Sequence, residues 1–454
     1  MVTKKKKLTK IQQLSPVKLI VLSYALAILI STFLLKGSIF LKPDQSLSLF
    51  DSLFTAISAI SVTGLSVIPI DQVFNTAGYF VLSLLIQLGG IGIMTLGTAV
   101  YIILRKKIGI RERQLISIDH NQSTLSGLVR LMLKILQTIV IIEFIGMLIL
   151  FICYLNYFST WQEALFQSYF ASISATTNAG IDITGVSFIP FANDYFVQTV
   201  HIILMILGAI GFPILIELQE WLFSKRKKEK SFYFSTFMKL NTLTYFLLVV
   251  FGAILIFLLE WRQFFQNQSW YEGLFSSLFY SITTRSGGLT TLNIQSFSTP
   301  TLMVLSILMF IGASPSSAGG GIRTTTFTII LLAIYNYAKG RQSIKIFKRE
   351  ISQEDVIRSF IVVITAILLV LISLFILSIT EPFSNLELFF EVFSAFGTTG
   401  LSLGITPELS PIGRIIIMIL MFVGRIGIFS FLFLIRGKPT KDLYHYPKAR
   451  MMIG

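Results

Sequence analysis

The sequence contains one cysteine, Cys153, and three histidines that are far apart in the chain, His120, His201 and His445. A single cysteine excludes a disulfide scaffold and a cysteine-based zinc cluster, and the histidines have no metal-ligand spacing. Charged residues are also scarce, at 13% of the 454 residues, while 54% are hydrophobic. A soluble domain has about 25% charged residues. The composition therefore excludes an ordinary soluble enzyme, a disordered chain and a fibrous protein, and indicates an integral membrane protein.

Eight apolar runs are long enough to cross a bilayer, which takes about 20 residues of helix. They do not alternate with the period of two expected of barrel strands. The first run is longer than the apolar core of a signal peptide, so we predict an uncleaved helix. The sixth is too long for one helix and is interrupted. The predicted spans lie near residues 17–35, 77–104, 131–155, 196–223, 239–260, 302–338, 357–379 and 411–435.

Basic residues exceed acidic residues by 37 to 22, which gives a formal net charge of +15. They gather at the chain start and after each even-numbered span, and cytoplasmic loops carry such an excess. We therefore predict a multi-pass protein of the cytoplasmic membrane with both termini in the cytoplasm. Contact with anionic lipid or a cytosolic partner is a reasonable second role for these clusters, and nucleic-acid binding is not favoured. The clusters are Lys4–Lys10, 105–113, Lys225–Lys228, Lys339–Arg349 and Arg436–Arg450.

A shorter motif lies between the two spans of each pair. It has about three turns of helix-compatible sequence and ends in a glycine followed by Leu or Ile. Those glycines are separated by 116, 108 and 112 residues, and a fixed period indicates an internal repeat. A small-residue motif follows each of them, its first glycine 24 to 28 residues later. Helix packing explains that second motif in part, but not its period. The two sets are Gly64, Gly180, Gly288 and Gly400, and Gly89, Gly208, Gly312 and Gly424.

The repeat unit is thus helix, short helix, loop, helix. The short helix cannot span the bilayer, so it must enter and leave from the outside, and irregular backbone at that depth must be buried in protein or line a water-filled path. We predict an all-α integral membrane fold with four helix–pore-helix–helix repeats around a pseudo-fourfold central pore. The repeats are residues 1–106, 107–232, 233–342, with an interrupted second helix, and 343–454, which includes the C-terminal tail.

Four glycine loops on one axis suit a bare cation. Rings of backbone carbonyls replace the hydration shell of potassium, and glycine reaches the backbone angles that aligned carbonyls need. The C-terminal ends of short helices aimed inward also favour a cation. Carboxylates near the helix starts favour capping over direct ion binding; they are Asp51, Glu163, Glu272 and Glu387.

With these features the sequence resembles the membrane subunit of a Ktr/Trk-type potassium uptake system, within the wider Trk/Ktr/HKT superfamily. The tail 444–454 and the chain length add to the likeness, which is more to Ktr than to the longer Trk subunits. The resemblance implies that Gly64, Gly180, Gly288 and Gly400 are selectivity-filter glycines. Glycine at all four goes with potassium preference, and one glycine per repeat implies looser discrimination against sodium than in tetrameric channels. The carbonyls just before them would belong to Val62 and Thr63, Asn178 and Ala179, Ser286 and Gly287, and Thr398 and Thr399.

The interruption of the sixth span contains a proline and three consecutive glycines, which loosen a helix. An extra crossing would place the cluster Lys339–Arg349 outside, so an intramembrane loop is favoured over an ordinary loop between two spans. The resemblance makes this loop a gate on the cytoplasmic side of the filter. Its residues are Gly312, Ala313, Ser314, Pro315, Ser316, Ser317, Ala318, Gly319, Gly320 and Gly321.

Two arginines lie at predicted membrane depth. A charge there costs roughly 2.5–3.5 kcal/mol, so Arg425 must face protein or the pore. We predict that it binds the gate loop and opposes cation passage; pairing with a buried acid is the alternative. For Arg285, three residues before Gly288, we predict a side chain that points away from the axis and holds the filter, with Glu391 as a candidate partner.

The chain has no nucleotide-binding motif and no catalytic constellation, so we predict no enzyme and no cofactor of its own. Cys153 and His201 are interpreted as packing residues. The resemblance implies a homodimer regulated by a ring of cytosolic nucleotide-binding subunits, with the tail 437–454 at the dimer interface. The transported ion is potassium, and sodium dependence is left open. The alternative is a secondary transporter of another monovalent cation, such as sodium or ammonium.

Overall fold

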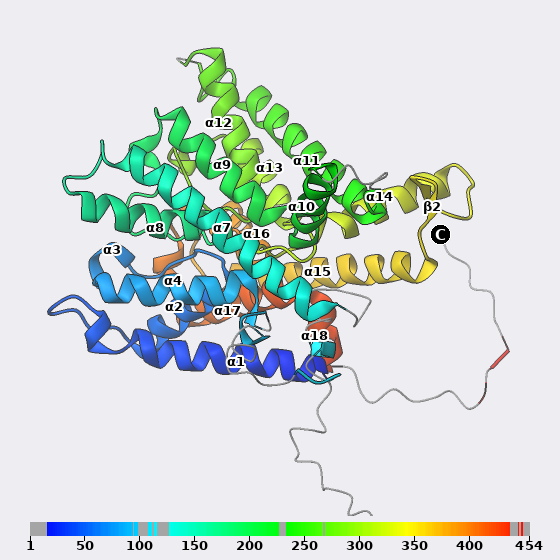
Figure 1. Ribbon diagram of the computed structural model, residues 1–454, viewed down its shortest axis with the longest axis horizontal. Coiled ribbons are helices and arrows are strands. Elements are labelled where there is room, and N and C mark those ends of the chain that lie inside the picture. The colour runs from blue at the N-terminus through cyan, green and yellow to red at the C-terminus, as the bar shows by residue number, and fades with distance from the viewer. Residues whose placement is uncertain are drawn as a thin grey trace, which may run out of the picture.

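Helices make up nearly all of the computed structural model, which describes residues 16–93, 95–98, 108–110, 113–115, 127–226, 233–266, 268–435, 444 and 446–447. One order of elements occurs four times along the chain (Figure 1). The first helix of each set is long: α1 (Pro16–Leu35), α7 (Leu128–Tyr154), α11 (Thr236–Glu260) and α15 (Gln353–Thr380). A short helix follows: α2 (Leu49–Ser61), α8 (Trp161–Thr177), α12 (Trp270–Thr283) and α16 (Asn385–Gly397).

The second long helix of each set comes after a loop: α4 (Thr76–Ile91), α9 (Tyr195–Ala209), α13 (Thr299–Phe310) and α17 (Pro411–Ile426). Three of these resume after a break as α10 (Phe212–Arg226), α14 (Thr324–Ala338) and α18 (Ile428–Ile435). Minor elements are α3 (Ile70–Val73), the 3₁₀ turns η2 (Ser38–Phe40), η3 (Ile189–Phe191), η4 (Ile294–Ser296) and η5 (Thr406–Glu408), and the hairpin β1 (Lys345–Ile346) with β2 (Arg349–Glu350). The all-helical fold that the sequence predicts is confirmed.

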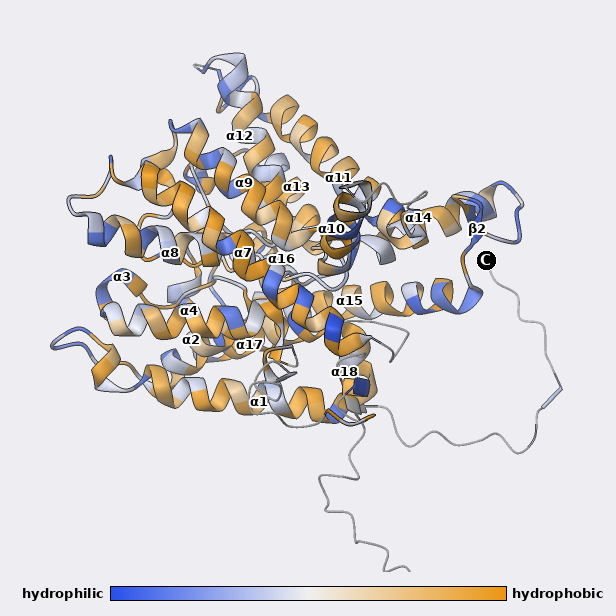
Figure 2. Cartoon of the chain, in the orientation of Figure 1, coloured by the Kyte–Doolittle hydropathy of each residue, from blue (hydrophilic) through white to orange (hydrophobic). Residues whose placement is uncertain are grey.

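The first helices carry large apolar side chains on their outer faces. Four such helices are long and apolar enough to cross a membrane, and hydrophobic residues predominate along the helices in Figure 2. Phe33, Ile152, Leu258 and Phe375, one on each of these helices, are 65–68% exposed. Water would not stabilise so much exposed apolar surface, whereas lipid is as apolar as the side chains themselves.

All four second helices are broken, whereas the sequence predicts a break in the sixth span alone. The chain bends by 103° between α9 and α10 and by 105° between α17 and α18. The breaks fall at Gly92 (φ 94°), Gly211 (φ 104°) and Gly427 (φ 86°), and residues 311–323 separate α13 from α14. Positive φ is a conformation that glycine adopts without steric cost. In the first, second and fourth sets, the last glycine of the small-residue motif is therefore the point at which the helix ends.

The short helices pack in a ring. Each contacts the first helix of its own set and the second helix of the preceding set: α4 with α8, α9 with α12, and α13 with α16. The contact between α17 and α2 joins the fourth set to the first and closes the ring. The ring brings the C-terminal ends of the four short helices to one place in the interior.

Three motif glycines allow this close packing. A Cβ at Gly89, Gly208 or Gly424 would overlap a backbone carbonyl oxygen at the end of the short helix of the same set. Those oxygens belong to the residue four before each loop glycine, namely Ile60, Thr176 and Phe396. The packing role expected for this motif is thus seen at equivalent positions in three sets.

Adding a methyl group at Gly424 is expected to destabilise the protein. Gly424→Ala would press α17 away from α16, and overpacking of this kind costs about 1–3 kcal/mol. The matched control is Gly97→Ala, where a Cβ would meet nothing within 4 Å. Thermal unfolding of the detergent-purified variants should show a lower Tm for Gly424→Ala alone. Equal Tm values for the two variants would contradict the packing argument.

Candidate functional site

Each short helix begins with a polar cap at its N-terminus. The side chains of Ser48, Thr160 and Ser384 accept hydrogen bonds from the backbone N–H of the acid three residues later, and the backbone N–H of Ser269 donates to Glu272 (2.9 Å). Carboxylates stabilise the positive end of a helix. These acids therefore lie far from the loop glycines, at the opposite helix ends, as capping requires. They are Asp51, Glu163, Glu272 and Glu387.

At the other end of each short helix the backbone changes hand. The residue two before each loop glycine is left-handed: Val62 (φ 57°), Asn178 (φ 57°), Ser286 (φ 71°) and Thr398 (φ 48°). The glycine itself also has positive φ: Gly64 (95°), Gly180 (62°), Gly288 (71°) and Gly400 (89°). Such angles in β-branched residues such as Val62 and Thr398 cost about 1–3 kcal/mol and cluster at functional sites.

The four loop glycines, Gly64, Gly180, Gly288 and Gly400, meet in a closed ring. A Cβ on Gly64, Gly288 or Gly400 would overlap the carbonyl oxygen of Ala179, Thr399 or Thr63, respectively. A Cβ on Gly180 would lie 3.1 Å from the carbonyl oxygen of Gly287. In each case the carbonyl belongs to the residue just before the loop glycine of the next set, and the fourth set meets the first. The structure thus brings together the residues that the sequence singles out.

Hydroxyl groups hold the loop backbone, and they are not among the site residues predicted from the sequence. Ser58 and Ser394 accept hydrogen bonds from the N–H of Gly64 and Gly400, both at 3.1 Å. Ser174 donates to the carbonyl of Ile181 (2.7 Å). A pattern in the sequence marks these serines, because all three precede an alanine and lie six residues before the loop glycine. The third set has Ile282 there, and Thr283 donates to the carbonyl of Leu289 (2.8 Å) instead.

The loop 312–321 crosses beside this ring. A Cβ on Gly319 would lie 2.6 Å from the Ser286 hydroxyl, and one on Gly320 would lie 2.5 Å from the Thr398 hydroxyl. The loop is also fastened to the end of α9, because Ser314 and Ala318 donate to the carbonyls of Ala209 and Gly208, both at 3.1 Å. The loop therefore packs against the left-handed residues of two sets while it is bonded to a third.

Three arginines donate hydrogen bonds to backbone carbonyls of the loop 312–321 and of the helix ends beside it. Arg285 donates to Leu308 (3.3 Å) and Ile311, directly before the loop. Arg323 donates to Ser314 (3.3 Å) and Gly319. Arg425 donates to Ala318, to Gly89 and to Gly90 (3.1 Å). The loop contact expected of Arg425 is confirmed, and none of its hydrogen-bond partners among the described residues is an acid.

The expected bond between Arg285 and Glu391 is not made. Glu391 accepts from Ser402 (2.8 Å) and Thr406, on the outer side of the fourth set. Arg285 instead lies fully buried against the C-terminal turn of α13. The end of a helix leaves unpaired carbonyls that attract a cation, and this attraction could not be read from the spacing of charges in the sequence.

His201 is buried and makes a contact between Nδ1 and the carbonyl of Val197 (2.9 Å), with its ring 4.0 Å from that of Phe188. Cys153 is half-buried and free. In the described part of the chain no group of three or more His, Cys, Asp or Glu residues could hold a metal. The packing interpretation of His201 agrees with its contacts.

Comparison with known proteins identifies the family. A family model described as "TrkH: Cation transport protein" matches residues 22–446. The chain belongs to this family of cation transporters. The family consists of membrane ion transporters and not of enzymes, in agreement with the prediction from the sequence.

Relatives cover the TrkH-family chain almost end to end. Ktr system potassium uptake protein D of Bacillus subtilis (strain 168) is 53% identical over 98% of both chains, and protein B of the same organism is 34% identical over 100% of both. Potassium/sodium uptake protein NtpJ of Enterococcus hirae is 32% identical over 98% of both. The crystal structure of the potassium transporter TrkH from Vibrio parahaemolyticus has the same fold, with a TM-score of 0.72, 18% identity and coverage of 94% and 86% of the two chains.

Removing a supporting hydroxyl is expected to loosen the ring. Ser394→Ala leaves the N–H of Gly400 without its partner, and a buried hydrogen bond contributes about 1 kcal/mol. In a TrkH-family protein the expected result is a smaller ratio of rubidium to sodium uptake in vesicles. Ser378→Ala is the control, since its hydroxyl bonds only its own helix at an exposed site. If both variants keep the same uptake ratio, Ser394 does not support the ring.

Proposed function

We propose that this protein takes up potassium ions across the cytoplasmic membrane through the ring of loop glycines. The observation that carries the proposal is the closed set of contacts between each loop glycine and the carbonyl of the next set. Curated relatives that match the chain end to end are named potassium uptake proteins, which supports the choice of ion. In this proposal the ring is the selectivity filter.

A potassium ion must lose its hydration shell to pass the ring. Backbone oxygens at the level of the filter replace the water around potassium, and the negative C-terminal ends of α2, α8, α12 and α16 meet at the same place and favour a cation. No acidic side chain belongs to the filter segments, so recognition rests on backbone oxygens. The proposed filter residues are Val62, Thr63, Gly64, Asn178, Ala179, Gly180, Ser286, Gly287, Gly288, Thr398, Thr399 and Gly400.

The loop 312–321 and Arg425 form the proposed gate. The loop lies against Ser286 and Thr398 of the filter and is bonded to Arg425, whose positive charge repels a cation. Glycine makes up four of its ten residues, so its backbone can change conformation at low cost. Displacement of the loop would open a path from the filter toward the cytoplasm.

Orientation and regulation complete the proposal. The start of α1, the hairpin β1–β2, the start of α15 and α18 lie toward the right of Figure 1, and we assign that side to the cytoplasm. The family resemblance and the names of relatives as proteins of a Ktr system support a homodimer regulated by a cytosolic nucleotide-binding ring. A relative is named potassium/sodium uptake protein, so the proposal includes sodium as a second ion that takes part in uptake. Most of the five basic clusters, and nearly all of the tail 437–454, lie outside the described residues.

Gly64→Ser is expected to relax the choice of potassium over sodium. The added side chain would overlap the carbonyl oxygen of Ala179 and is strained at φ 95°, so the ring must widen. We expect the potassium-to-sodium uptake ratio to fall about tenfold, since a loss of about 1.4 kcal/mol is a factor of ten. The measurement is potassium uptake competed by sodium in a strain that lacks its own uptake systems. Gly97→Ser is the control, and an unaltered ratio in Gly64→Ser would refute the filter assignment.

Shortening the loop is expected to raise flux. Deletion of Ser316–Ala318 removes the carbonyls that accept from Phe212 and Arg425, so the loop can no longer cross below the filter. Rubidium influx into vesicles should increase several-fold at unchanged protein level. A deletion of equal length at the exposed segment Arg341–Ser343 controls for general disturbance. Equal rubidium influx in the two deletion variants would contradict the assignment of the loop as a gate, and it would not affect the assignment of the filter.

A further inference from the structure

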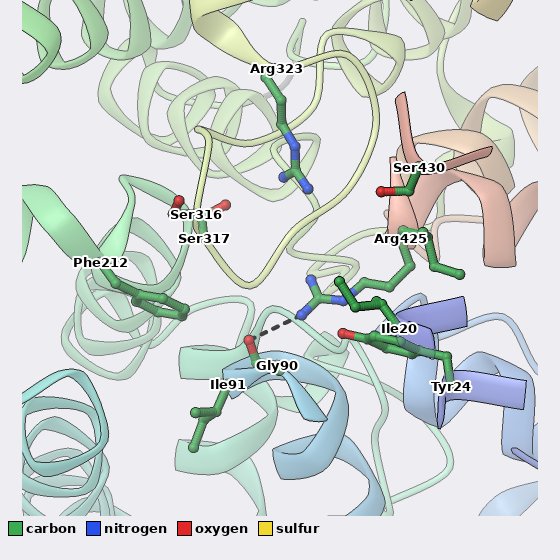
Figure 3. A pocket seen from close by; sticks show the side chains of 12 residues that line it. Ile20, Tyr24, Gly90, Ile91, Phe212, Ser316, Ser317, Arg323, Arg425 and Ser430 are labelled. Atoms are coloured by element: carbon green, nitrogen blue, oxygen red, sulfur yellow. Dashed lines mark hydrogen bonds between the residues drawn. The ribbon is translucent and has the colours of Figure 1, made fainter. Parts of the chain in front are cut away.

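A small cavity of about 60 Å³ lies between the loop 312–321, α1, α4 and α17. Its lining is polar for a site within a membrane protein and includes Tyr24, Ser316, Ser317, Arg323, Arg425 and Ser430. Figure 3 shows the guanidinium group of Arg323 directed toward that of Arg425, which in turn reaches the carbonyl of Gly90. Arg323 is the N-cap of α14 and is bonded to the loop, and Arg425 belongs to α17, so the cavity is bounded by the proposed gate and its partner helix.

No acidic side chain among the described residues pairs with either of the two positive charges in this cavity. The ion pairs formed by described residues are Lys134 with Glu220, Arg358 with Glu354 and Asp355, and Arg414 with Asp51. None of them includes Arg323 or Arg425. Arg425 is 8% exposed, so water screens it poorly. Buried charges in proteins are paired or bind an ion, and arginine does not lose its proton to relieve the repulsion.

Both arginines also have N–H groups left over. A guanidinium has five N–H donors. Arg323 uses Nη1 for the carbonyls of Ser314 and Gly319, and its Nε and Nη2 bond none of the described residues. Arg425 uses Nη1 and Nη2 for carbonyls of Ala318, Gly89 and Gly90, which leaves its Nε without a described partner. Donors from two elements are thus available to a ligand that carries negative charge.

We propose that this cavity binds one small inorganic anion, chloride, between Arg323 and Arg425. The anion neutralises part of the repulsion and accepts hydrogen bonds from the spare N–H groups. Because Arg323 is bonded to the loop and Arg425 belongs to α17, the bound anion ties the loop to α17. Chloride therefore stabilises the closed gate, a consequence that rests on the proposed function, whereas the binding itself does not.

The binding test uses the purified full-length protein at constant potassium and ionic strength. Replacing gluconate by chloride should raise the Tm in a saturable way, because a ligand that binds only the folded state stabilises it; gluconate, with its six-carbon chain, is too large for the cavity. Equilibrium binding of radioactive chloride should reach one ion per chain. Arg323→Gln and Arg425→Gln should each lose both effects, and Arg358→Gln, which removes an exposed cation of α15, should keep them.

The outcomes separate this proposal from the transport proposal. A wild-type Tm that is equal in chloride and gluconate, or no saturable chloride binding, would overturn the anion site even if rubidium uptake is normal. If the glutamine variants do not fold, the number of chloride ions bound per wild-type chain still decides whether the anion site exists. Rubidium flux in proteoliposomes should be several-fold lower in chloride than in gluconate, and this difference should vanish in Arg323→Gln. Absence of rubidium flux in every medium would instead count against transport and leave chloride binding intact.

Discussion

Contact between backbones of different repeats is the constraint on which this structure depends. Each loop glycine lies so close to the carbonyl of the next set that a side chain would force the loops apart. Packing of this kind requires that the short helices also approach the second helices without intervening side chains, and Gly89, Gly208 and Gly424 supply that approach. The two recurring glycine motifs therefore both allow close contact between backbones. One lets the loops meet, and the other lets the helices that carry the loops converge.

The third set departs from this pattern of contacts between the motif glycine and the short helix. Its motif glycine, Gly312, lies against Gly320 of its own loop and not against the short helix. The second helix has ended at Phe310, which leaves carbonyls that the helix would otherwise have used. Arg285, which directly follows α12 and its C-cap, binds two of these carbonyls. A break at membrane depth is thus compensated by a buried cation, since unpaired carbonyls there would cost several kcal/mol each.

Much of this arrangement could be predicted from the sequence. The period of the glycines gave the four short helices, and the convergence of Gly64, Gly180, Gly288 and Gly400 followed from topology. The breaks at Gly211 and Gly427 could not be found in the same way. A run of apolar residues indicates that a segment is hydrophobic, but it does not indicate where the backbone takes a positive φ. The partner of Arg285 was missed for a related reason. Its partners are carbonyls exposed by a helix end, and such groups have no signature among the side chains.

The break in α9 is also part of the loop's support. The N–H of Phe212, the first residue of α10, donates to the carbonyl of Ser316 (2.8 Å), while Ser314 and Ala318 donate to the end of α9. The loop thus bridges the bend between these two helices, at the glycine that makes the bend possible. The loop cannot leave its position without losing these three bonds, and α10 cannot change its angle to α9 while all three remain. Because α10 leads toward the predicted cytoplasmic side and ends at Arg226, a force applied to its far end acts directly on the backbone of the proposed gate.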